Sequence, residues 1–279
     1  AAASADRINA VLDTAPEIVD PAHPIEPSLA SEPHTVEFRD VTFSYPGAEQ
    51  PALSHISFSA DPGEVTAIIG GTGAGKSTLI KLIPRFYDVD SGSVLVDGVD
   101  VRELSQRSLR SRISLVPQQT VLFSGTIADN IRFGDREASD EELMRVAGIA
   151  QAAEFIAGTS DGLESVVAQG GSNFSGGQKQ RLSIARAIAR KPEIYIFDDS
   201  FSALDFKTDA RVRAALRQET TRATVLIVAQ RVATVMDADR IIVLDEGEIA
   251  GIGTHRDLMV TCGVYREIVA SQLSPEEVA

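Results

Sequence analysis

The sequence is poor in the residues that form disulfides, bind polyanions or cross membranes. It contains one cysteine, Cys262, so no internal disulfide can form, and we expect a reducing compartment. Its 26 Lys and Arg are outnumbered by 40 Asp and Glu, and the formal net charge of −14 argues against nucleic acid or an anionic lipid surface as the main partner. No apolar run approaches the roughly 20 residues that a membrane helix needs, and no signal peptide opens the chain. With 43% apolar residues among 279, the sequence predicts a soluble globular chain.

An initiator Met is also absent. Ala1 stands in a helix-like stretch with an apolar side that includes Val11 and Leu12, so we expect the chain to be a piece of a longer polypeptide. From Thr14 to Pro33, five prolines stand among acidic and small residues, a composition typical of a linker. The sequence therefore predicts the end of a helix and a linker at residues 1–33, the main domain at residues 34–273, and a tail at residues 274–279.

What the sequence does contain is a glycine-rich loop between a strand-like and a helix-like stretch. The glycines let the backbone turn its N–H groups toward one anion, and the following helix presents its positive end. Lys76 is placed to reach the β- and γ-phosphates of a nucleotide, and Ser77 to bind Mg²⁺. A nucleoside triphosphate is therefore the predicted ligand. The loop consists of Gly70, Gly71, Thr72, Gly73, Ala74, Gly75, Lys76 and Ser77.

Three further strand-like segments end in polar residues. Tyr45 stands before a Pro-Gly turn and can stack on an adenine ring, although a Tyr at a strand end is often structural. Gln118 follows an apolar strand and can bind Mg²⁺ or the attacking water, but two glutamines in a loop mean little by themselves. Another apolar strand delivers Asp198, which suits Mg²⁺ bound through water, and Asp199, where a general base belongs.

The other segments outline a sheet interrupted by helices. Residues 126–159 have a helical pattern and predict a helical insert at about residues 120–191. Residues 36–43 alternate around an Arg39-Asp40 turn, which predicts two short strands. Further strands are predicted at residues 53–59, 65–69, 93–98 and 224–229, and a closing hairpin around Glu246-Gly247.

A second anion-binding geometry lies at the start of a long helix. Ser175 and two glycines precede that helix, where free N–H groups and the positive end of the helix dipole attract anions. An ordinary N-cap is the alternative interpretation. One chain rarely needs two phosphate cradles for a single nucleotide. The second cradle therefore needs another explanation.

Five motifs, GGTGAGKST, VPQQ, FSGGQ, YIFDDS and SALD, occur in this order and at these separations. The chain thus resembles the nucleotide-binding domain of an ABC transporter over roughly residues 35–273, and FSGGQ is much more specific than the phosphate loop alone. Residues 121–131, the helix at residues 4–9 and the Gly-Thr-His at residues 253–255 resemble the exporter branch, which includes multidrug and lipid exporters. This resemblance implies an α/β fold: a P-loop NTPase (RecA-like) core with an antiparallel β subdomain and an inserted α-helical subdomain.

The resemblance also implies partners and cofactors. Six membrane helices are expected ahead of Ala1, on the same polypeptide, with the domain at the cytoplasmic face of a membrane, the inner membrane if the source is bacterial. Two nucleotide-binding domains would face each other head to tail, so each ATP lies between one chain's phosphate loop and the partner's SGGQ. ATP and Mg²⁺ are the implied cofactors, and nucleic acid is not a partner. The second cradle is then explained, because it would serve the partner's ATP.

The resemblance assigns a role to each motif residue. Tyr45 is implied to contact adenine, and the loop with Thr78 the phosphates; Mg²⁺ is assigned to Ser77, Gln118 and, through water, Asp198. The residues implied to complete the partner's site or cross the interface are Ser175, Gly176, Gly177, Gln178 and Asp205.

Two departures from the family pattern fall in the catalytic machinery, which by resemblance consists of Lys76, Asp199 and Gln230. Asp199 stands where the hydrolytically competent pattern has Glu and is one methylene shorter; a misplacement of about 1 Å can lower a rate on the order of 10²-fold. Gln230 stands where the family has a switch His, and an amide cannot carry the charge of an imidazole. Gln169 replaces a usual Glu, which puts the charged contact to the membrane domain in doubt. The histidines are His23, His34, His55 and His255, and none is at the switch position.

Both catalytic departures fall in the same composite site, while FSGGQ stays intact for the other. This is the pattern of the degenerate half of a heterodimeric exporter. The predicted function is an ATP-binding and ATP-hydrolysing motor domain whose own Lys76 site binds ATP and turns over slowly, while hydrolysis occurs mainly at the partner's site. A regulatory ATP-binding module with negligible turnover and a soluble ABC ATPase are the alternatives. The single cassette and the helix ahead of the linker argue against the soluble class. Lipid, drug, peptide and siderophore cargo are left open.

Overall fold

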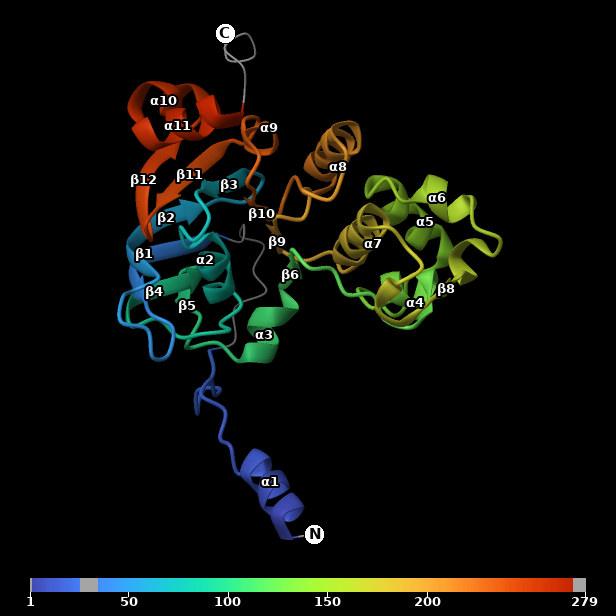
Figure 1. The fold of residues 1–279 in the computed structure, drawn as a ribbon, viewed down its shortest axis with the longest axis horizontal. Coiled ribbons are helices and arrows are strands. Elements are labelled where there is room, and N and C mark those ends of the chain that lie inside the picture. Colours follow the sequence, from blue (N-terminus) through green and yellow to red (C-terminus); the bar gives the residue numbers. More distant parts are fainter. Residues whose placement is uncertain (1, 26–34, 273–279) are drawn as a thin grey trace.

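The structure is a computed structural model that describes residues 2–25 and 35–272 (Figure 1). The expected boundary between residues 33 and 34 and the expected tail at residues 274–279 lie outside the described residues, as does His34. Within those two ranges, no helix is both long enough and apolar enough to cross a membrane.

A small antiparallel sheet forms one part of the molecule, with the strand order β2-β1-β4-β5. Along β1 and β2, buried positions largely alternate with more exposed ones, as expected for a sheet with one face on the core. The prediction of two short strands around Arg39-Asp40 was wrong. One strand runs through this point, and Asp40 sits in the left-handed region (φ 49°) where the register with β2 shifts between Phe38 and Val41. The strands are β1 (Val36–Phe43), β2 (Leu53–Ala60), β4 (Ser91–Val96) and β5 (Val99–Asp100).

A larger sheet has six strands in the order β12-β11-β3-β10-β9-β6. All neighbours are parallel except β12, which pairs antiparallel with β11 as the predicted hairpin. The interior strands β9 and β10 are buried at every residue, which is why their sequences are continuous apolar runs. The strands are β3 (Val65–Gly70), β6 (Ile113–Val116), β9 (Ile194–Asp198), β10 (Thr224–Val228), β11 (Arg240–Asp245) and β12 (Glu248–Gly253).

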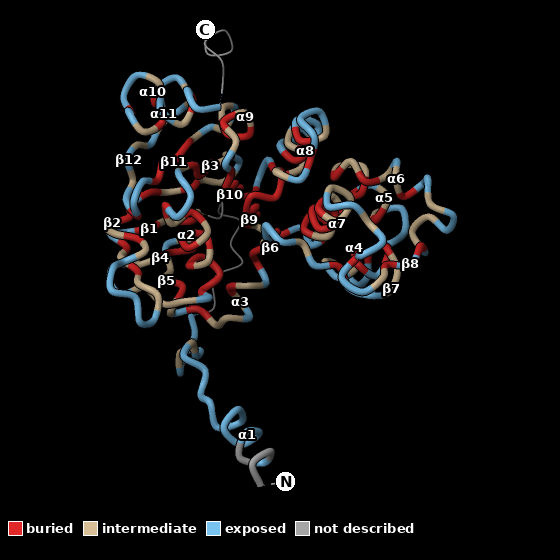
Figure 2. Tube along the Cα trace, viewed as in Figure 1, coloured by how far each residue is buried: buried red, intermediate tan, exposed pale blue. Residues whose placement is uncertain are grey.

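The helix α2 (Lys76–Leu82) lies between the two sheets (Figure 1). Its apolar residues share one core with the antiparallel sheet and one face of the parallel sheet, and the other face of that sheet packs in a second core with the remaining helices. The two cores thus lie on opposite faces of the parallel sheet, and buried residues run along its strands (Figure 2). The helices of the second core include α8 (Phe206–Glu219), α9 (Val232–Val235), α10 (His255–Thr261) and α11 (Gly263–Gln272).

The predicted helical insert forms a separate lobe on one side of the sheets (Figure 1). Together with the two sheets, it gives the α/β fold of a P-loop NTPase core with an antiparallel β subdomain and a helical subdomain, as expected. Ahead of the domain, α1 (Ala2–Leu12) projects away from it, and Val11 and Leu12 are exposed. The lobe contains β7 (Gly125–Thr126), α4 (Ile127–Arg132), α5 (Asp140–Ile149), α6 (Ala153–Ala157), β8 (Val166–Val167) and α7 (Gly176–Ala189).

Candidate nucleotide-binding site

The carboxyl ends of four parallel strands meet at one edge of the large sheet. The glycine-rich loop follows β3, Asp198 ends β9, and Asp199 comes directly after it. Gln118 and Gln230 stand two residues beyond β6 and β10, respectively. Loops at such an edge are where open α/β sheets bind ligands. The structure brings these residues together around a cavity of about 370 Å³. Its lining includes Tyr45, Ala52, Thr72, Gly73, Gly75, Lys76, Ser77, Thr78, Gln118, Asp198, Asp199, Val228 and Gln230.

The loop can form only because glycine stands at two tight points. Gly75 precedes α2 with φ 95°, and a Cβ atom there would lie 2.7 Å from Leu53 Cδ2 and 2.8 Å from the Ala52 carbonyl oxygen. At Gly70, a Cβ atom would lie 2.2 Å from the carbonyl oxygen of Leu244. The backbone therefore turns tightly between β3 and α2, as a phosphate cradle requires.

Lys76 extends over the loop that precedes it. Its Nζ donates hydrogen bonds to the carbonyl oxygens of Gly70 (2.8 Å) and Gly71 (2.6 Å). Burial lowers the pKa of this ammonium group, while the nearby carboxylates of Asp199 and Asp198 act in the opposite direction. The loop thus holds the cation in the cavity, where it can exchange carbonyl oxygens for phosphate oxygens.

Ser77 and Asp198 lie within reach of one cation. The hydroxyl of Ser77 donates to Asp198 Oδ1 at 3.0 Å. Burial raises the pKa of Asp198, and this effect is opposed by the Ser77 hydrogen bond and by Lys81. A bound Mg²⁺ would reverse the burial effect by favouring the ionised carboxylate. Hydroxyl and carboxylate oxygens, with the amide oxygen of Gln118 nearby, are the hard donors that Mg²⁺ takes, so these residues fit the ion.

Asp199 is held by two glutamine side chains. Both Gln118 Nε2 and Gln230 Nε2 donate to the same oxygen, Asp199 Oδ2, each at 3.0 Å. The residue has a left-handed backbone (φ 47°), and its N–H donates to the Val228 carbonyl at 2.9 Å. Since a carboxylate oxygen has about two lone-pair sites, the two amides leave Oδ1 as the oxygen for any further partner. We refer to Gln118, Asp199 and Gln230 as the glutamine clamp.

Tyr45 lies at the rim of the cavity, where it also has a structural role. Its hydroxyl is 3.0 Å from Thr78 Oγ1, and its ring packs edge-on against Phe43 and Tyr87 at centroid distances of 5.0 and 5.3 Å. These contacts bear on the structural interpretation, and the contact with adenine stays a prediction. Its neighbours fix the ring beside the loop.

The second cradle lies outside this cavity. Ser175 is the N-cap of α7, where its Oγ accepts from Gln178 N (3.3 Å) while its own N–H donates to Gln178 Oε1 (2.9 Å). A Cβ atom on Gly177 would lie 3.2 Å from the Ala203 carbonyl oxygen, so the signature packs against the loop at residues 202–205. Asp205 ends that loop as the N-cap of α8. Neither this residue nor residues 175–178 line the cavity.

Sequence reasoning missed two contacts that hold these loops. Thr120 Oγ1 donates to Gln180 Oε1, which ties the loop after Gln118 to the signature helix; Gln180 is buried. Arg231 donates to the carbonyl oxygens of Ser202 (2.8 Å) and Leu204 (3.3 Å). A polar residue on the buried face of a predicted helix was the available indication for Gln180. For Arg231 the sequence offered no such indication, because its partners lie 27 and 29 residues away along the chain.

Comparisons with known proteins agree with this geometry. The family described as ABC transporter matches residues 53–202. An uncharacterized ABC transporter ATP-binding protein of Mycobacterium tuberculosis is 50% identical over 275 residues, covering 98% of this chain and 47% of that protein. An ATP-dependent lipid A-core flippase of Thiobacillus denitrificans is 44% identical over 256 residues, covering 91% of this chain and 43% of the flippase. The solved structure of a bacterial Atm1-family exporter with ATP bound matches with a TM-score of 0.90 at 37% identity, covering 96% of this chain and 47% of that one. The chain thus spans about half the length of the relatives it matches.

Proposed function

The chain belongs to the ABC transporter family, and from that membership we propose that it is the ATP-binding and ATP-hydrolysing domain of an exporter. Two relatives support the exporter branch, since one is named a flippase and the other an exporter. Both are longer than this chain, so we infer a membrane domain ahead of residue 1 on the same polypeptide. Residues 1–33 would connect the two, residues 34–273 would form the ATPase domain at the cytoplasmic face of a membrane, and residues 274–279 a tail.

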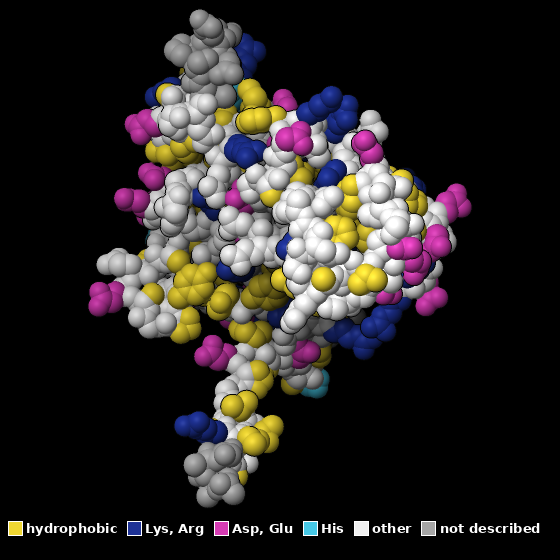
Figure 3. Space-filling view, turned by 45° about the vertical axis from the view of Figure 1, so that its right-hand side comes forward, with side chains coloured by type: hydrophobic (Ala, Val, Ile, Leu, Met, Phe, Trp, Pro, Cys, Tyr) yellow, Lys and Arg dark blue, Asp and Glu magenta, His cyan; other side chains and the backbone are white. Residues whose placement is uncertain are grey.

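The cavity supports ATP and Mg²⁺ as the ligands. ATP supplies the phosphoanhydride bond that is hydrolysed, and Mg²⁺ neutralises phosphate charge. The backbone of residues 70–75, of which Thr72, Gly73 and Gly75 line the cavity, would bind phosphate oxygens. Lys76 would bind them as a cation, and Tyr45 would stack on adenine. Ser77, Asp198 and Gln118 would hold the metal. The formal net charge of −14 supports a partner other than nucleic acid, and acidic and basic side chains are mixed on the face drawn in Figure 3.

A second nucleotide-binding domain is the inferred partner. Ser175 to Gln178 carry an exposed helix N-terminus but lie outside the chain's own cavity, so they are free to serve a nucleotide held by another chain. Asp205 lies in the loop beside them. A head-to-tail pair would use both faces at once, with each ATP between one chain's phosphate loop and the other chain's signature.

The glutamine clamp supports a slow site on this chain. A general base needs a free lone pair directed at the attacking water. In Asp199 two amides occupy Oδ2 and fix the orientation of the carboxylate, so only Oδ1, on a side chain one methylene shorter than Glu, is left to accept the proton. Gln230 remains neutral at every pH, so it cannot take up a proton as His does. We therefore propose that the Lys76 site binds ATP and turns over slowly, and that a different partner chain supplies the competent Glu and His. The observation that carries the proposal is that Lys76, Asp198 and the glutamine clamp line one cavity.

The first test is ATP turnover by the complete transporter. Asp199→Glu and Gln230→His are compared singly and together with the wild type, with and without a Glu→Gln change at the partner's base. The partner change should lower turnover by about 10²-fold or more, and the double substitution in this chain should restore part of it. Lys76→Ala is the control for nucleotide binding at this site and should abolish the restored turnover.

Three outcomes contradict parts of this proposal. Substantial wild-type turnover after removal of the partner's acid would make Asp199 a working base. Absence of turnover in every variant, with ATP still bound, would favour a regulatory binding module, which the clamp also fits. A complete protein that pairs with a copy of itself would contradict the heterodimer.

A further inference from the structure

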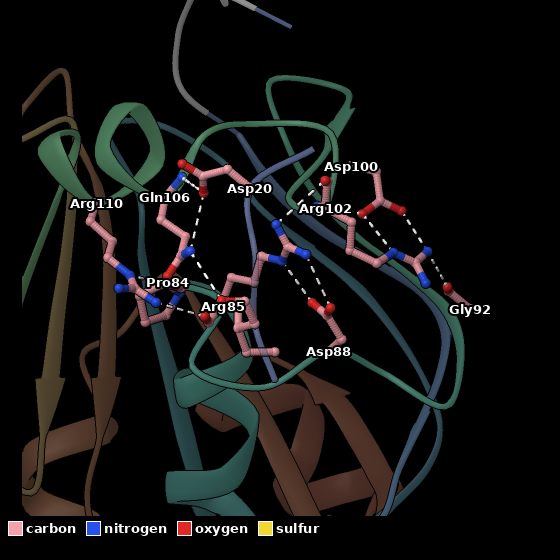
Figure 4. A network of polar contacts seen from close by, with 10 residues as sticks. Asp20, Pro84, Arg85, Asp88, Gly92, Asp100, Arg102, Gln106 and Arg110 are labelled. Carbon is pink, nitrogen blue, oxygen red and sulfur yellow. Dashed lines mark hydrogen bonds and ion pairs between the residues drawn. The ribbon is translucent and has the colours of Figure 1, made fainter. Parts of the chain in front are cut away.

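A segment ahead of the domain is docked on its surface beside α3 (Gln106–Ser111). Asp20 Oδ1 accepts hydrogen bonds from Gln106 N at 2.9 Å and from Gln106 Nε2 at 3.1 Å (Figure 4). The same Nε2 reaches the Ile18 carbonyl at 3.4 Å, and Ile25 N donates to the Glu103 carbonyl at 2.8 Å. We call residues 18–25 the strap. Asp20 is 86 residues from Gln106 along the chain, yet the two residues are in contact.

Asp20 contributes to the start of α3. Ser105 is the N-cap of that helix and accepts from Ser108 N, while Asp20 accepts from the N–H of the first helical residue. A carboxylate is favoured there because it faces unpaired N–H groups. The hydrogen bonds from Gln106, and to a smaller extent the charges of Arg85 and Arg110, hold the pKa of Asp20 below its usual value. The negative charge of Asp20 therefore faces N–H donors and nearby arginines where the strap docks.

The helix α3 also contacts both halves of the nucleotide machinery. Arg110 donates to the carbonyl oxygens of Pro84 (3.0 Å) and Arg85 (2.9 Å), in the turn that follows α2 (Figure 4). Its guanidinium lies 5.3 Å from the Phe86 ring centroid. Arg190, just after α7, donates to the Arg110 carbonyl at 2.7 Å. One short helix thus joins the strap, the far end of the helix that begins at Lys76, and the far end of the signature helix.

We propose that Asp20 is a positioning residue that docks the strap on α3 and thereby couples the segment ahead of the domain to α2 and α7. This rests on the proposed function in one respect, that α1 continues into a membrane domain. A displacement of α1 then reaches the phosphate loop and the signature through α3, within this chain. The docking contacts are few and Asp20 is exposed, so the strap can release and dock again.

Hydrogen exchange on the complete polypeptide in lipid nanodiscs tests the coupling. Asp20→Ala should raise exchange in residues 18–25 about tenfold, with smaller increases in residues 106–111, 84–86 and 189–191. Asp20→Asn keeps an acceptor oxygen and should restore most of the protection. Glu17→Ala, which removes an exposed acid three residues earlier, is the matched control and should change none of these segments. ATP affinity should stay within about twofold in all variants, since none of these residues lines the cavity.

Two results would overturn the inference. Equal exchange of residues 18–25 in Asp20→Ala and the wild type would mean that Asp20 does not dock the strap. An increase in hydrogen exchange confined to residues 18–25 would mean that α3 does not couple the strap to α2 or α7. Both readouts are obtained without nucleotide. A wild type that fails to bind ATP would therefore count against the proposed function alone.

Discussion

At the scale of single residues, the site depends on backbone geometry as much as on side-chain chemistry. Gly75 has φ 95°, which L side chains rarely adopt, and the Ala52 carbonyl stands 2.8 Å from where a Cβ atom would be. A methyl group there meets backbone that cannot move aside without shifting β2. The phosphate loop and the edge of the antiparallel sheet are thus built against each other.

We expect Gly75→Ala to lower the free energy of unfolding by about 1–3 kcal/mol, from the left-handed backbone and the close contact together. Urea titration followed by circular dichroism measures this. Gly71→Ala is the control, because nothing lies within 4 Å of the position of its Cβ atom and its φ is not positive. Equal loss of stability in the two variants would show that the close contact at Gly75 is not what requires glycine.

At the scale of elements, the signature is a helix start that has two roles. Ser175 caps α7 in a reciprocal pair with Gln178, and the same N-terminus is the one proposed to bind the partner's ATP. The structural and functional roles can be separated, because α5 begins with a similar cap. Ser139 accepts from Glu142 N at 3.3 Å, the distance found between Ser175 and Gln178 N.

We expect Ser175→Ala and Ser139→Ala each to lower the free energy of unfolding by about 1 kcal/mol, as the loss of a serine cap does. Ser175→Ala alone should also lower ATP turnover of the paired transporter about tenfold or more, since only it removes a ligand of the partner's nucleotide. Unchanged ATP affinity at the chain's own Lys76 is part of the expected result. If Ser139→Ala lowers turnover equally, the effect is one of stability and the signature role is wrong.

Elements that depend on local pattern were predictable, and contacts between distant segments were not. The loop around Lys76 and the buried strand that ends at Asp198 follow from glycine spacing and an apolar run. The irregularity at Asp40 was missed because a left-handed residue inside a strand resembles a turn in sequence. The Asp20–Gln106 contact spans 86 residues, and no spacing rule encodes it.

The clamp illustrates the same limit within the site. Gln118 and Gln230 were each singled out from the ends of their strands, with different roles. That both amides would meet one oxygen of Asp199 depends on the order β10-β9-β6 in the sheet, which places these strand ends next to each other. Strand order is a property of the whole fold. The sequence therefore could not predict that Gln118 and Gln230 donate to the same oxygen of Asp199.

At the scale of the whole molecule, the helical lobe is joined to the sheet domain by an ion-pair network. Arg145 on α5 donates to Glu142 of the same helix at 2.7 Å and to Glu219 at the end of α8 at 2.8 Å. Lys191, beyond α7, lies 2.9 Å from Glu142. Arg145 and Lys191 lower the pKa of Glu142 to about 2. The network therefore connects α5 to α8 through Glu219 and to the residue beyond the end of α7 through Glu142.

We expect Glu142→Gln to lower the free energy of unfolding by about 1 kcal/mol at pH 7, a value typical of a partly exposed charged network. The folded-state pKa lies below the usual value near 4.5, so the folded protein binds the proton less readily than the unfolded chain does. The stabilisation is therefore complete above about pH 5, falls as the pH drops from 4.5, and is absent below about pH 2. Urea titrations of both proteins at pH 7 and pH 3.5 should give a smaller difference at the lower pH.

The neighbouring acid separates this explanation from a general effect of charge. Glu141 is exposed on the same turn of α5, and Glu141→Gln removes the same charge without removing the partner of Arg145 and Lys191. Its unfolding free energy should match the wild type within about 0.5 kcal/mol at both pH values. A pH-independent difference between Glu142→Gln and the wild type would show that the ionised carboxylate of Glu142 does not stabilise the contact between α5 and the end of α7. In that case the orientation of α7, and with it the signature, would depend on the apolar contacts of the lobe alone.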